Sequence, residues 1–69
     1  MLCASVITHH GKRYEFPDIM RSAVVSQAKE MHERKDNPNL VFYGLNGACL
    51  VLPKRVIATV LAGEEVLYG

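Results

Sequence analysis

The sequence predicts an α+β fold: a small single domain of the order ββαββ(β), in which one amphipathic helix packs on a mostly antiparallel sheet. Two observations lead to this prediction. Turn residues separate short segments rich in apolar and β-branched residues, and one central segment repeats apolar residues at the spacing of a helix face. The expected elements within one domain, 1–69, are a hairpin over 2–16, a helix over 18–34, a hairpin over 39–53 and strands over 55–68.

The first hairpin is expected to turn at His10 and Gly11, because a tight turn demands the positive φ angle that glycine supplies. A two-residue turn at this point would place Ser5 opposite Phe16 and so assign every side chain to a face. One face would carry Cys3, Ile7, Tyr14 and Phe16, and the other would carry Leu2, Ala4, Val6, Arg13 and Glu15.

The helix follows Pro17, and Asp18 is expected to be its N-cap residue. Apolar residues recur at spacings of three and four and form a stripe that should face the sheet: Met20, Val24, Ala28 and Met31. Val25 lies beside this stripe and is the apolar helix residue least well placed for the core. Glu30 and Arg34 are correctly spaced and oriented for an ion pair along the helix.

The segment 39–53 is apolar on both sides of Asn46-Gly47, a dipeptide that strongly favours a two-residue type I′ turn. Such a turn would place Tyr43 opposite Leu50 on one face and Phe42 opposite Val51 on the other. A β-branched run then predicts a fifth strand, although 56–61 is short enough to fit a helix as well. Gly63 indicates another turn, and residues 65–69 predict a short sixth strand.

The apolar residues exceed what one helix can cover, since a helix covers only one face of a sheet. Large uncovered apolar patches are uncommon in monomers and mark association sites. We therefore expect a homo-oligomer, most simply a two-fold dimer, that binds another protein through an apolar sheet face or edge strand. The expected interaction residues are Leu2, Ala4, Val6, Val25, Leu40, Phe42 and Val51. Alternatively, strand twist, the carboxy-terminal strand and the long side chains of Arg13 and Lys54 shield this surface in a monomer.

Eight Lys and Arg residues against seven Asp and Glu residues give a formal charge of +1, so no net field attracts the chain to nucleic acid or an anionic membrane. Basic residues nevertheless occur in short local groups. Two alternative functions would use them: a nucleic-acid-binding regulator, or a binder of a small anionic ligand at a subunit interface. The residues concerned are Lys12, Arg13, Lys54 and Arg55.

The sequence gives no indication of a catalytic residue, a cofactor or a metal site. His9 and His10 are adjacent, and neighbouring strand residues point to opposite faces. Cys3 and Cys49 lie in apolar strand patterns and lack a close CxxC spacing, although one bridge between them stays possible. No apolar run approaches the roughly 18 residues of a membrane span, and the amino terminus lacks a signal-peptide pattern. We expect a non-enzymatic, cytoplasmic protein with an accessory, regulatory or inhibitory role.

Overall fold

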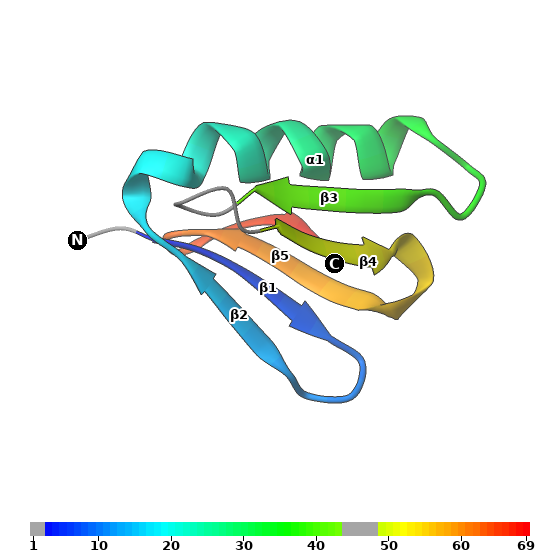
Figure 1. Ribbon diagram of the computed structural model, residues 1–69, viewed down its shortest axis with the longest axis horizontal. Coiled ribbons are helices and arrows are strands. Elements are labelled where there is room, and N and C mark those ends of the chain that lie inside the picture. The colour runs from blue at the N-terminus through cyan, green and yellow to red at the C-terminus, as the bar shows by residue number, and fades with distance from the viewer. Residues whose placement is uncertain (1–2, 44–48) are drawn as a thin grey trace.

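A computed structural model describes residues 3–43 and 49–69. Its elements in chain order are β1 (Ala4–Thr8), β2 (Arg13–Phe16), the 3-10 turn η1 (Asp18–Met20), α1 (Arg21–Glu33), β3 (Asn39–Tyr43), β4 (Cys49–Pro53), the 3-10 turn η3 (Lys54–Val56), β5 (Ile57–Ala62) and β6 (Glu65–Tyr68) (Figure 1). The predicted α+β class, with one helix on a mostly antiparallel sheet, is confirmed. The ambiguous segment 56–61 lies mostly in strand β5 and contains no helical turn beyond the end of η3.

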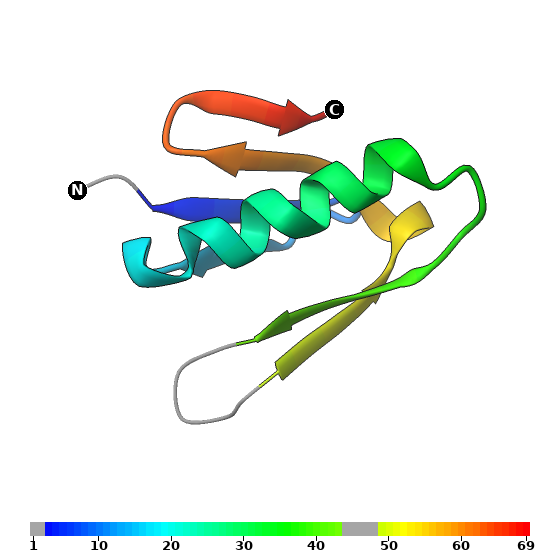
Figure 2. The same ribbon diagram turned by 90° about the horizontal axis from the view of Figure 1, so that it is seen from above.

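The strands form two antiparallel sheets. One has four strands in the order β2-β1-β5-β6, and the other is the β3-β4 pair. Figure 2 shows α1 crossing above the four-stranded sheet, with the β3-β4 pair beside it. The helix contacts β3, β5 and β6. The inner face of the larger sheet is therefore covered jointly, by the helix and by the hairpin.

The core lies between these layers. Phe42 of β3 stacks on Phe16 of β2, with ring centroids 5.7 Å apart and an interplanar angle of 30°. The predicted helix stripe is confirmed, because all four of its residues are buried: Met20, Val24, Ala28 and Met31. Val25 is 39% exposed, as its position beside the stripe suggested. Among the described residues, no helix combines the length and apolar character needed to cross a membrane.

The predicted register of the first hairpin is wrong by one residue. Ala4 pairs with Phe16 and Val6 pairs with Tyr14, so these four residues share a face. Ala4 and Val6 are both fully buried in the core. A one-residue slip transfers every side chain of a strand to the other face, so the two faces assigned from the sequence are exchanged for β1 relative to β2.

The reason for the slip is the length of the turn. Gly11 N–H donates a hydrogen bond to Thr8 O at 3.0 Å, and Thr8 N–H donates to Lys12 O at 2.9 Å. These bonds enclose a three-residue loop, 9–11, instead of a two-residue one. Gly11 has a φ angle of 84°, which fits the left-handed bulge residue that closes such a loop.

The register of the second hairpin also differs by one residue from the prediction. Phe42 pairs with Leu50, and Tyr43 pairs with Cys49, whereas a two-residue turn at Asn46-Gly47 would pair Tyr43 with Leu50. The predicted turn itself lies outside the described residues. Phe42 is 1% exposed and Tyr43 is 65% exposed, so the face expected to be uncovered is the one that packs on Phe16.

The start of the helix also differs from the prediction, since Asp18 is not its N-cap. Asp18 begins η1, and Met20 is the N-cap of α1 without a capping side-chain hydrogen bond. Met20 N–H donates to Pro17 O at 2.9 Å. This tight turn holds the Met20 side chain in the core, where it is 8% exposed, and packing thus replaces capping at this end.

Candidate functional site

The outer face of the β3-β4 pair leaves an apolar surface exposed. We call it the hairpin surface and define it by Val41, Tyr43, Cys49 and Val51. Tyr43 is 65% exposed and Val51 is 51% exposed. Neither strand contains a charged residue, so nothing on this ribbon supplies the charges that usually protect exposed strands from association.

Strand β4 also has a free edge, because its only partner among the described strands is β3. Lys54 N–H donates to Pro38 O at 2.9 Å, directly beyond the ladder. Hydrogen-bonded and non-hydrogen-bonded pairs alternate along an antiparallel ladder. Counting from this bond, the backbone groups of Cys49 and Val51 point away from β3. The free edge therefore presents backbone donors and acceptors at the same residues whose side chains are exposed.

The structure places only part of the predicted interaction set on the surface. Four of its members lie in the core and cannot contact a partner of the folded chain: Ala4, Val6, Leu40 and Phe42. Leu2 lies outside the described residues. Val25 and Val51 are exposed, and only Val51 belongs to the hairpin surface. Tyr43 and Cys49 were not predicted, because the run 39–53 is apolar on both faces. Only the packing of Phe42 on Phe16 shows which of the two faces is buried.

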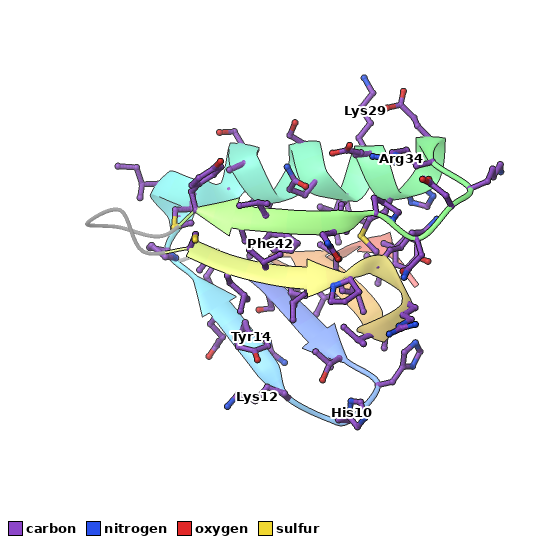
Figure 3. All side chains as sticks on the ribbon, turned by 45° about the vertical axis from the view of Figure 1, so that its right-hand side comes forward. His10, Lys12, Tyr14, Lys29, Arg34 and Phe42 are labelled. Atoms are coloured by element: carbon purple, nitrogen blue, oxygen red, sulfur yellow. The ribbon has the colours of Figure 1, made fainter. Side chains whose placement is uncertain are left out.

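Two of the four predicted basic residues are engaged on the four-stranded sheet. Arg13 Nη2 donates to Ser5 Oγ at 3.2 Å and lies 3.8 Å, Nε to Oε1, from Glu15. Ser5 is only 1% exposed, so this hydrogen bond gives a buried hydroxyl a partner. The Lys12 ammonium lies 5.6 Å from the centroid of the Tyr14 ring on β2 (Figure 3).

The other two basic residues line a cleft with a volume of about 350 Å³. We call it the basic cleft and define it by His9, Lys35, Asn37, Lys54, Arg55 and Tyr68, which come from the first turn, the loop after α1, η3 and β6. Three hydrogen bonds join the first turn, the loop after α1 and η3: Arg55 N–H to Asn37 Oδ1 at 2.8 Å, His9 N–H to Val56 O at 3.0 Å, and Lys54 Nζ to Arg34 O at 2.5 Å. The cleft lies within one chain, whereas the anion site was expected between subunits.

One carboxylate, Asp36, also lines the cleft. Arg34 Nη2 and Nε donate to its two oxygens at 2.6 and 3.1 Å. The hydrogen bonds from Arg34 hold the pKa of Asp36 below its usual value, and those to Asp36 raise the pKa of Arg34. Arg34 also forms the predicted helix pair with Glu30, at 3.6 Å. The carboxylate of the cleft therefore stays ionised and already has a cationic partner.

Chemistry-bearing residues outside the cleft are dispersed. In the part of the chain that the structure describes, no group of three or more His, Cys, Asp or Glu side chains could hold a metal ion, and Cys3 and Cys49 are both free. His32 Nε2 lies 2.6 Å from Leu67 O; because a carbonyl only accepts, this nitrogen carries the proton and ties α1 to β6.

Neither a protein-family model nor a curated protein nor a solved structure matches this chain. Its function is therefore inferred from the hairpin surface, the free edge of β4 and the basic cleft.

Proposed function

We propose that this chain is a non-enzymatic binding protein that forms a two-fold dimer through the free edge of β4. The observation that supports this proposal most directly is an unpaired, uncharged strand edge whose neighbouring side chains, such as Val51, are half exposed. The unpaired backbone groups of a free strand edge are a template for further strands. A second copy of the chain supplies those strands.

A second copy fits because a two-fold axis pairs a strand with itself in antiparallel orientation. With the axis at Leu50, Cys49 of one copy lies opposite Val51 of the other, and both carry outward-pointing backbone groups. Neither residue is charged, so no like charges meet across the axis. Pro53 has no N–H to donate and limits the pairing to the middle of the strand.

The dimer would join two β3-β4 pairs into one four-stranded sheet. Its outer face would carry both copies of Val41, Tyr43 and Val51, and exposed apolar patches of this kind mark sites of protein association. The accessory, regulatory or inhibitory role expected from the sequence rests on this surface. It stays a prediction, as does the cytoplasmic location.

Sedimentation equilibrium tests the dimer directly. We expect a mass of twice the 7.7 kDa of one chain, and a monomer for Val51→Lys, because a charge beside the free edge opposes pairing. Val66→Lys is the matched control, since Val66 is a valine of similar exposure, 58% against 51% for Val51, on β6. A wild-type protein that sediments as a monomer throughout the micromolar range would refute the proposal. So would a Val51→Lys variant that remains dimeric.

A nucleic-acid-binding role has less support. It would use Lys12 and Arg13 together with Lys54 and Arg55, but only the latter two line the basic cleft. Lys12 lies over Tyr14 and Arg13 lies against Ser5. Phosphate tracking along a strand of nucleic acid requires a continuous row of such residues.

A further inference from the structure

We infer that the basic cleft binds the phosphate group of a small organic ligand. The site is formed within one chain and does not depend on the proposed dimer. Four separate segments contribute to it, and hydrogen bonds between three of them fix its walls before any ligand arrives.

The first step is the rigidity of the cleft. Lys54 N–H donates to Pro38 O at 2.9 Å, and Arg55 N–H donates to Asn37 Oδ1 at 2.8 Å. These two bonds hold η3 against the loop that follows α1. His9 N–H donates to Val56 O at 3.0 Å and holds the first turn against the other end of η3. A site whose backbone is already fixed loses less conformational entropy on binding.

The second step is its charge. All seven Asp and Glu side chains of the sequence belong to described residues, and among them only Asp36 lines the cleft. Arg34 engages both oxygens of that carboxylate. None of the ion pairs between described residues includes Lys35, Lys54 or Arg55. Asp36 is near enough to Lys54 for the two charges to attract, but three cations and Arg34 outnumber this single carboxylate, so the net positive charge of the cleft favours an anion.

The end of α1 opposes this preference in part, because helix C-termini carry partial negative charge. Lys54 offsets the effect: its ammonium donates to Arg34 O, at the C-cap of the helix, at 2.5 Å. An ammonium has three hydrogens, so donors remain for a ligand. Lys54 thus links the helix end to the cleft. Lys35 and Arg55 are exposed, and neither belongs to an ion pair between described residues.

The third step is the shape and lining of the cleft. Its volume of about 350 Å³ is near the lower limit for small-molecule sites. Tyr68, which is half-buried with its ring centroid 5.3 Å from that of His32, supplies an aromatic ring beside the cations. Asn37 uses its Oδ1 to hold Arg55 N–H, which leaves the amide hydrogens of its side chain as neutral donors. This combination fits a phosphate monoester with a small planar or apolar group.

An NMR titration with inorganic phosphate and with phenyl phosphate tests the inference, with sodium chloride added to keep ionic strength constant. We expect saturable shifts of the amide signals at 9, 35–37 and 54–57, and tighter binding of phenyl phosphate than of inorganic phosphate. Arg55→Glu and Lys35→Glu should each weaken binding by about tenfold, because each replaces an attractive charge by a repulsive one near the phosphate. Lys54 is left unchanged because it also holds the helix end.

Lys29→Glu is the matched control. Lys29 is an exposed cation of the same chain, and it projects from α1 away from the sheets (Figure 3). It should leave the affinity unchanged, and the spectra should show that every variant is folded. Equal weakening by Lys29→Glu and Arg55→Glu would mean general charge attraction and would overturn the site. Shifts that never saturate would do the same.

Two further titrations distinguish binding of a small phosphate ligand from nucleic-acid binding and from dimer formation. A single-stranded oligonucleotide that binds more tightly than phenyl phosphate, and loses affinity in Lys12→Glu, would overturn the small-ligand assignment in favour of nucleic acid. The Val51→Lys variant should keep its phosphate affinity even as a monomer. Loss of phosphate binding in that variant would contradict a site contained in one chain, whatever the outcome for the dimer.

Discussion

Phe42 and Tyr43 are neighbouring aromatic residues of β3 with opposite surroundings. Phe42 is 1% exposed and stacks on Phe16, while Tyr43 is 65% exposed. Phe42→Ala should lower the free energy of unfolding by about 3 to 5 kcal/mol, because it leaves a cavity in the core. Tyr43→Ala should change it by no more than about 0.5 kcal/mol. Urea unfolding measures both.

Phe42→Leu keeps this test usable if the alanine variant does not fold, since a smaller volume change should cost about 1 to 2 kcal/mol. The faces expected from the sequence give the reverse order, with Phe42 on the uncovered face and Tyr43 on the face that the helix covers. A larger loss for Tyr43→Ala than for Phe42→Leu would therefore contradict the burial of the Phe42 face of the hairpin.

Local interactions between residues were predictable, and interactions across loops were not. The Glu30–Arg34 pair follows from helix spacing alone, and it forms. The stronger partner of Arg34 is Asp36, in the loop beyond the helix. Periodicity does not predict where a loop residue lies. The hydrogen bonds from Arg34 to the Asp36 carboxylate could therefore be seen only in the structure.

At the scale of elements, the first turn depends on Gly11, whose φ angle is 84°. A Cβ at this position would meet no atom within 4 Å, so the cost of a side chain arises from the backbone alone. Gly11→Ala should destabilise the fold by about 1 kcal/mol. Gly11→Asn should cost less, because asparagine adopts left-handed conformations more readily. Thermal unfolding of both variants checks this, and an unchanged midpoint for Gly11→Ala would contradict the turn.

The helix and the strands could be predicted from periodicity, but the register of both hairpins could not. Two-residue and three-residue turns both require a residue with positive φ, so Gly11 fits either one. The hydrophobic pattern normally decides the register when one face is polar. Residues 39–43 and 49–53 carry no such contrast, since Val41 and Val51 on the outer face are as apolar as their neighbours in the core.

At the scale of the whole molecule, the main feature that the sequence does not predict is the division of the strands into two sheets. The β3-β4 pair does not join the four-stranded sheet. It lies beside α1 and covers part of the inner face of that sheet (Figure 2). This arrangement buries residues expected to form an interaction surface, and it exposes others. It also brings residues 9, 35 and 54 to one cleft. Sequence separation this large leaves no local signal, which explains why only Lys54 and Arg55 of the cleft were anticipated.

The proposed dimer makes the stability of the whole molecule depend on its concentration. A chain of this size buries only roughly 60% of the surface that its unfolded form exposes and is marginal by itself, so pairing through β4 should contribute measurably. For a dimer that unfolds to two separate chains, each tenfold rise in protein concentration should stabilise the folded state by about 1.4 kcal/mol per dimer. Urea unfolding across a hundredfold range of concentration would show this as a rising midpoint. Val51→Lys should remove the dependence and Val66→Lys should keep it. A wild-type midpoint that stays constant would mean that β4 remains unpaired and that the hairpin surface is stable without a second copy.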